Sequence, residues 1–208
     1  MTDILFELQR ALEELYRVDA EADVRDFVIS DKSRESHGAG RASREQLLLR
    51  EDERGLEVGL FVDELALGRL DRGLDPRGAN LGEFLLAAEG VSHFLYVSVR
   101  AREERRFSGL ELELQAEVDK YLLTLLAAWP HADGLRERLF ARVSFLGDLS
   151  TEEHDRYHAA NAAADGYVAS LEARFVRPRR VEDLLAELRR FYRLDCAGKL
   201  DHIVKRAA

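Results

Sequence analysis

Residues 81–129 read LGEFLLAAEGVSHFLYVSVRARE (81–103), ERRF (104–107) and SGLELELQAEVDKYLLTLLAAW (108–129), and this stretch decides the fold. In its first part, apolar residues recur at steps of three and four, which is the spacing of one helix face. Residues 91–99 also alternate as a strand would, but the helical rhythm continues unbroken on both sides of them and favours a helix. The stretch therefore predicts two long helices in tandem with a short break between them.

The second of these helices is predicted to lie at the centre of the protein. Ser108 and Glu111 form an S-x-x-E capping box at its start, and apolar residues then occur on two sides of the helix. A helix that is apolar on two sides is surrounded by other elements. Ser150 and Glu153 form another capping box later in the chain. After the central helix, the same periodicity predicts helices at about 133–146, 150–175, 181–193 and 197–206.

The N-terminal part of the chain carries a different pattern. Residues 3–18 have the spacing of an amphipathic helix, whereas DVRDFVIS (23–30) is rich in β-branched and aromatic residues, as strands are. Residues 46–64 fit a β-hairpin whose turn contains Gly55, a residue that adopts positive φ without strain. These segments together predict a small antiparallel sheet with one helix beside it.

Two segments have the composition of loops. DKSRESHGAGRAS (31–43) lies among the predicted strands, and GRLDRGLDPRGAN (68–80) contains four glycines or prolines, which makes it the clearest boundary in the chain. We therefore expect one domain over residues 1–208, α+β in class and mainly helical. An N-terminal helix and a small antiparallel sheet of about three strands (1–75) would pack on a C-terminal bundle of five or six helices (80–208).

Composition restricts the class of protein. Apolar residues make up 46% of the 208 positions and charged residues 34%, which is typical of a globular protein. No apolar run approaches the roughly 18 residues that span a bilayer, and the first residues lack the basic start and cleavage site of a secretory signal. The one cysteine, Cys196, excludes an intramolecular disulfide and a Cys-rich zinc site. We therefore expect a cytoplasmic protein without a membrane segment.

Four polar residues within the two long helices are candidates for chemistry. Glu89 and His93 are four residues apart, as are Glu113 and Glu117, so each pair shares one face of its helix. Carboxylate and imidazole groups on facing helices are the ligands with which bundle proteins hold iron, manganese or zinc. The spacing differs from the Glu-x-x-His of di-iron bundles, and the same groups could also serve as a general acid–base pair.

A simpler interpretation of these four residues needs no ligand. Glu117 could pair with Lys120, three residues later on the same helix, and Glu113 could lie on a solvated stripe with Thr124. His93 could be a hydrogen-bonded histidine of the core. The two interpretations differ in whether the pairs converge, which depends on how the helices pack.

A histidine pair on the helix predicted at 150–175 offers a second place for a metal ion. His154 and His158 are four residues apart, which is the spacing of the two histidines in the zinc helix H-E-x-x-H. Here Asp155 follows the first histidine, the general-base glutamate is missing, and no third ligand is evident. A histidine pair on a solvated helix face also explains this spacing.

Charge is distributed unevenly along the chain. From Arg174 onward ten Lys or Arg residues stand against five Asp or Glu, an excess of +5, so with a total of −9 the first 173 residues carry −14. An acidic body argues against nucleic-acid binding, because phosphate contacts need a positive field. The basic tail could bind an acidic protein partner through Arg189, Arg190 and Arg193, contact nucleic acid, or dock on its own acidic body.

The sequence contains no nucleotide-binding loop and no nucleophile elbow, and it predicts no cofactor other than the divalent metal considered above. We therefore interpret the chain as a non-enzymatic interaction or regulatory protein that binds a protein partner through charged surfaces. A helical carboxylate/histidine metal-binding protein or metalloenzyme is the alternative. Nucleic-acid binding through the basic tail is a second alternative, and the oligomeric state stays open.

Overall fold

The computed structural model describes residues 3–36, 43–53, 55–70, 80–128, 134–141 and 150–207. Most of these residues are helical, and they include one antiparallel sheet of two strands, so the class is α+β and mainly helical, as expected. Within the described residues the elements are, in chain order, α1 (Asp3–Tyr16), the 3-10 turn η1 (Val24–Phe27), α2 (Asp31–Ser36), β1 (Glu45–Asp52), β2 (Gly55–Val62), α3 (Glu64–Leu70), α4 (Leu81–Arg102), α5 (Gly109–Ala128), α6 (Leu135–Phe140), α7 (Thr151–Leu171), the π-helical turn η2 (Glu172–Val176), α8 (Val181–Arg193) and α9 (Cys196–Ala207).

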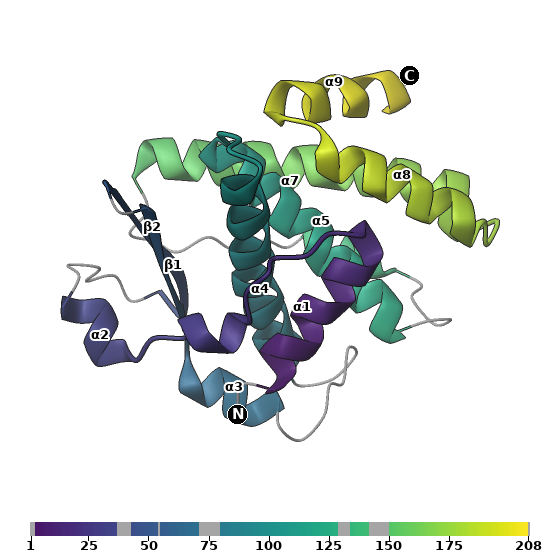
Figure 1. Ribbon diagram of the computed structural model, residues 1–208. Helices are drawn as coiled ribbons and strands as arrows, with labels where there is room; N and C mark the ends of the chain where they lie inside the picture. Colours follow the sequence, from purple (N-terminus) through teal and green to yellow (C-terminus); the bar gives the residue numbers. More distant parts are fainter. Residues whose placement is uncertain are drawn as a thin grey trace.

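Helix α4 lies at the centre of the fold, with the β-hairpin on one side and α1 on the other (Figure 1). The helix predicted over 91–99 is confirmed, because these residues all belong to α4. Every residue from 91 to 97 is buried. A helix buried on every side carries apolar residues on every side, which explains why its sequence also fits the alternation of a strand.

Helix α5 packs against both α4 and α7, so the prediction that this helix is central is confirmed. Its start is capped by Ser108, whose hydroxyl accepts a hydrogen bond from the N–H of Glu111 at 3.1 Å. The side chain of Glu111 does not complete the predicted capping box. It turns inward and accepts hydrogen bonds from the hydroxyl of Tyr96 and the N–H of Cys196, because those buried donors need an acceptor.

Strands β1 and β2 form the predicted hairpin. Their antiparallel register runs from Glu45 opposite Val62 to Asp52 opposite Gly55. Gly55 adopts a φ of 134°, which suits glycine and strains other residues. Both strands contact α4, and Leu60 is completely buried there.

The third strand expected from residues 23–30 is not formed. Residues 24–27 turn in η1, where the carboxylate of Asp23 accepts a hydrogen bond from the N–H of Arg25 at 3.0 Å. A local side-chain cap of this kind competes with strand pairing. Only Val28 pairs with the hairpin, through a single parallel bridge to Leu60. Within the described residues the sheet therefore has two strands, not three.

Two short helices, α2 and α3, include residues that were expected in loops. In α2 the guanidinium of Arg34 pairs with Asp31, one turn earlier, at 2.5 Å. Such a pair stabilises a helix whose residue types otherwise favour loops. Helix α3 begins at Glu64, directly after the hairpin, and extends into the predicted boundary. Residues 71–79 of that boundary lie outside the described part of the chain.

The C-terminal helices agree with the predictions. Helix α7 opens with the predicted capping box, in which Ser150 and Glu153 each bind the other's backbone N–H, and its last turn widens into η2. Helix α8 packs on α1, and α9 packs on α7. The helix predicted at 133–146 is an exception: α6 covers only residues 135–140 and ends with Ala141 as its C-cap, and residues 142–149 lie outside the described residues.

The apolar core includes side chains from both halves of the chain. Leu12 of α1, Leu60 of β2, Phe94 of α4, Leu122 of α5 and Val168 of α7 belong to the same cluster of buried residues. None of the described helices is both long and apolar enough to cross a membrane. The polar residues buried beside this core are the exceptions, and each needs a partner to offset its lost hydration.

Candidate metal centre

The four polar residues singled out in α4 and α5 come together between these helices. The short connection at 103–108 makes the helices antiparallel, so their residues pair in opposite order. We call each set of facing residues a rung. In the first rung, Nε2 of His93 on α4 is 3.5 Å from Oε2 of Glu113 on α5. In the second rung, one turn along, Glu89 and Glu117 contact the same lysine. Equal four-residue spacing on both helices thus produces two matching rungs.

The imidazole of His93 lies between two carboxylates. Its Nδ1 is 3.6 Å from Oε1 of Glu45, and its Nε2 is 3.5 Å from Oε2 of Glu113. Both distances exceed those of a hydrogen bond. Among the described residues, therefore, neither Nε2 of His93 nor Oε1 of Glu45 has a hydrogen-bond partner, although His93 is only 5% exposed. Buried polar atoms in this condition are rare in folded proteins.

Three of these groups have the spacing of metal ligands. Glu89, His93 and Glu113 each offer one ligand atom, and these atoms all lie within 4.8 Å of one another. Two ligands bound to one ion at about 2.1 Å stand roughly 3.0–3.4 Å apart when their angle at the ion is about 90–110°. The 3.5 Å between His93 and Glu113 is close to that separation. The group can therefore hold a divalent ion after small side-chain movements.

Glu45, which sequence reasoning did not single out, reaches the site from β1. The hairpin can approach α4 closely because residue 90 is glycine. A Cβ there would lie 3.0 Å from Cδ1 of Leu60 and 3.2 Å from Cγ of Glu45, which is tighter than ordinary contact. Glycine inside a helix lowers the stability of the helix by about 1 kcal/mol relative to alanine. The close approach of the hairpin explains why residue 90 is nevertheless glycine. This glycine was the one sign of the contact in the sequence.

Burial and charge change the pKa values of the cluster. Burial alone would lower the pKa of His93, but Glu113 and Glu45 outweigh it and hold that pKa well above its ordinary value. Burial raises the pKa of Glu45 and also that of Glu117. The pKa of the Tyr157 phenol, on α7, is raised by burial and then by the nearby carboxylates. Four carboxylates stand against one imidazole and one lysine in this site, an arrangement that favours a further cation.

Lys120 occupies the second rung. Its Nζ donates to Oε2 of Glu89 at 3.0 Å and to Oε1 of Glu117 at 2.8 Å. Burial lowers the pKa of Lys120, but the two carboxylates outweigh burial and raise that pKa above its usual value. The pairing of Glu117 with Lys120 is therefore confirmed. The solvated stripe expected for Glu113 and Thr124 is wrong, because both residues are buried.

The histidine pair of α7 lies on an exposed helix face. The Nε2 atoms of His154 and His158 are 3.1 Å apart, and Oδ1 of Asp155 is 3.9 Å from Nδ1 of His154. Within the described part of the chain, no group of three ligands includes this pair. As a metal site it is therefore weaker than the group between α4 and α5.

Two of the three arginines singled out in the tail bind the protein's own backbone. Nε of Arg189 donates to the carbonyl of Leu15 at 3.0 Å, and Nη2 of Arg193 donates to the carbonyl of Tyr16 at 3.3 Å. These carbonyls belong to the last turn of α1, where a positive charge offsets the helix dipole. Arg190 is exposed. Partner binding by the three arginines stays a prediction, but two of them already have a structural role.

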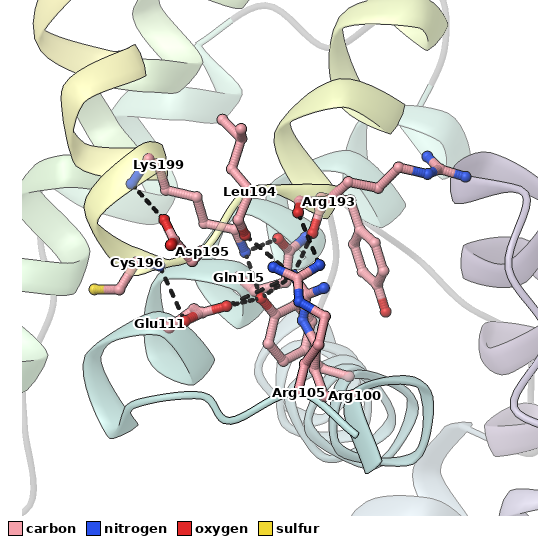
Figure 2. A network of polar contacts seen from close by, with 12 residues as sticks. Arg100, Arg105, Glu111, Gln115, Arg193, Leu194, Asp195, Cys196 and Lys199 are labelled. Carbon is pink, nitrogen blue, oxygen red and sulfur yellow. Dashed lines mark hydrogen bonds and ion pairs between the residues drawn. The ribbon is translucent and has the colours of Figure 1, made fainter. Parts of the chain in front are cut away.

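A second buried polar cluster joins α4 and α5 to the C-terminal segment (Figure 2). The amine of Lys199 donates to Oε1 of Gln115 at 2.7 Å and to the hydroxyl of Tyr96 at 3.0 Å. The same hydroxyl donates to Glu111 and accepts from Arg100. Lys199, which the sequence places in the basic tail, is completely buried. It therefore adds nothing to the positive surface.

Burial sets the protonation of this second cluster. It lowers the pKa of Lys199 to about 7 and raises the pKa of Asp119 to about 6. Asp119 accepts hydrogen bonds from Tyr16, Ser92 and Gln115. Because these groups bind one another in the interior, the cluster fastens α9 to the core and offers no approach to a ligand. Its sign in the sequence was the occurrence of Gln115 and Asp119 among the apolar residues of α5.

Comparison of the chain with protein-family models, with curated proteins and with solved structures gave no match in any of the three. Function must therefore be inferred from the side chains themselves. Between α4 and α5 they combine burial, convergent ligand groups and a polar atom without a hydrogen bond to any described residue.

Proposed function

We propose that the protein binds one divalent metal ion between α4 and α5, with Glu89, Glu113 and Nε2 of His93 as its ligands. One observation above all supports this proposal. The buried Nε2 of His93 faces a carboxylate, yet it has no hydrogen bond to any described residue. A metal ion would take the place of the proton on that nitrogen and offset the negative charge around it.

Glu45 would act on the other side of the imidazole. Histidine ligands generally donate their second ring N–H to a carboxylate, which fixes the tautomer and the orientation of the ring. Oε1 of Glu45 stands near Nδ1 of His93, and Glu113 stands near Nε2. Glu45, His93 and the ion would then form a carboxylate–histidine–metal arrangement.

The donor set indicates the class of ion and the type of site. Two carboxylates and one imidazole suit manganese, iron(II) or zinc. Three protein ligands leave coordination positions for water or a small ligand, as catalytic sites do, whereas structural zinc sites have four protein ligands. The side chain of Glu89 is 24% exposed, which supports a route from solvent. We therefore favour a site of the catalytic type.

Untagged protein that has been loaded with manganese, iron(II) or zinc is expected to retain one ion per chain in elemental analysis. Glu113→Gln, which removes a charged ligand at nearly constant volume, should abolish this retention. Glu45→Gln should weaken metal affinity about 10- to 100-fold, the usual effect of losing a carboxylate behind a histidine ligand.

The double substitution His154→Gln with His158→Gln is the matched control, because it removes two imidazoles that are also spaced for a metal. It should leave the ion in place. Wild-type protein that retains no metal after loading would disprove the proposed function. So would a Glu113→Gln variant that is folded by circular dichroism and retains as much metal as wild type.

Partner binding through the basic tail is a separate proposal. Because Arg189 and Arg193 stabilise α1, reversing their charge would disturb the fold as well as the surface. Arg190 is exposed and gives the cleaner test. Arg190→Glu is expected to weaken the binding of an acidic partner and to make the affinity less dependent on salt concentration. Arg138→Glu, at an exposed position outside the tail, is the control. Unchanged binding in Arg190→Glu would contradict this proposal.

A further inference from the structure

The second rung also joins α4 to α5, but in this rung the amine of Lys120 lies between two carboxylates. Glu89 and Glu117 approach from α4 and α5, and Nζ of Lys120 lies between them at 3.0 and 2.8 Å. Glu89 also belongs to the ligand group of the first rung. Its carboxylate therefore connects two neighbouring cation positions, as a carboxylate does between the metals of a two-metal site.

Charge explains why the second position needs a cation. Four carboxylates meet in this mostly buried site: those of Glu45 and Glu113 face His93, and those of Glu89 and Glu117 face Lys120. Buried carboxylates repel one another unless cations lie between them. Lys120 supplies one such positive charge. Because its ammonium is covalently part of α5, it cannot dissociate into solvent as a bound metal ion can.

We propose that Lys120 is a built-in cation that limits the site to one metal ion. This inference rests on the proposed metal site and deepens it: the chain has carboxylates for two divalent ions, and the ammonium occupies the second position. Metal–oxygen bonds are about 2.1 Å long, so an ion between Glu89 and Glu117 would need their oxygens to move inward by roughly 1 Å. The ammonium blocks that movement. Lys120 would thus determine the number of metal ions without being a ligand.

The test counts metal ions in wild-type protein and in the variant Lys120→Ala. Both proteins are loaded with Mn(II), freed of unbound metal by desalting, and analysed for manganese per chain. Wild type is expected to hold one ion and Lys120→Ala two. Electron paramagnetic resonance gives an independent measurement, because two manganese ions bridged by Glu89 couple magnetically and a single ion does not.

Three further variants control for charge, ligand loss and folding. Lys120→Arg keeps the positive charge and should stay at one ion. Lys120→Ala combined with Glu117→Gln lacks both the ammonium and a ligand of the second position, and should return from two ions to one. If Lys120→Ala does not fold, Lys120→Gln replaces it, because the amide keeps a hydrogen-bond donor between the carboxylates.

The outcomes separate this inference from the proposed function. One ion in wild type and one in folded Lys120→Ala would overturn the role of Lys120 and leave the metal site intact. Two ions in wild type would also overturn it, because the lysine would then not exclude the second ion. No ion in wild type would overturn the proposed function, and this inference with it.

Discussion

Arg100→Met is expected to lower the free energy of unfolding by about 3–5 kcal/mol. Arg100 is 1% exposed, and its Nη2 donates to the carbonyls of Tyr192 at 2.8 Å and Leu194 at 3.0 Å (Figure 2). Methionine fills a similar space but donates no hydrogen bond. The variant leaves these carbonyls without their donor, and it leaves Glu111 without a guanidinium 3.6 Å away. Buried polar groups that lose a partner bear their full desolvation penalty.

Urea unfolding followed by circular dichroism measures this loss. Arg105→Met is the matched control, because Arg105 follows the same helix and its guanidinium donates to the carbonyl of Arg193 at 3.1 Å. Its side chain is 39% exposed, however, and exposed contacts of this kind contribute less than about 1 kcal/mol. Equal losses in the two variants would contradict the importance assigned to the burial of Arg100.

The contribution of Lys199 to the stability of the protein is expected to rise between pH 7 and 9. Burial lowers its pKa to about 7 in the folded chain, against 10.5 for an ordinary lysine. Between these values the unfolded chain binds more protons, so raising the pH favours the folded state. The contribution of Lys199 to stability is fully present above its unfolded pKa of 10.5. It is lost as the pH falls through its folded pKa of about 7. The slope is at most about 1.4 kcal/mol per pH unit.

The groups around the Lys199 amine set its pKa together. Glu111, Asp119 and Cys196 raise it and Arg100 lowers it, but burial outweighs them all. Asp119 titrates at about 6. Its raised pKa contributes stability at low pH that is lost as the pH rises through that value, below the interval tested.

Lys199→Met isolates the contribution of this amine. Unfolding free energies of wild type and variant are compared in urea at pH 7, 8 and 9, and the difference between the two proteins should grow with pH in favour of wild type. Parallel dependence on pH in the two proteins would show that Lys199 is not the responsible group.

Several helices could be predicted because their signals act within a few turns of the chain. The capping box of Ser150 and Glu153 is present as its spacing predicts. The strand predicted at 23–30 was wrong because strand formation depends on pairing with distant residues. In its place Asp23 caps a local turn.

The candidate site could be predicted in part. Helix geometry alone places Glu89 on one face with His93, and Glu113 on one face with Glu117. Their convergence required α4 and α5 to pack in antiparallel order. Glu45 could not be predicted, because its position depends on the hairpin folding against α4.

By itself, the sequence determined the class of fold, the long helices and the polar residues that share a helix face, because these depend on neighbours within one or two helical turns. Only the tertiary structure decided which polar residues are buried and which charges face them. Lys120 and Lys199 illustrate the reason. Both are lysines in amphipathic sequence, yet carboxylates from two helices raise the pKa of Lys120, while burial lowers that of Lys199 to about 7. Burial and opposing charge come from other elements of the fold, and local sequence does not contain them.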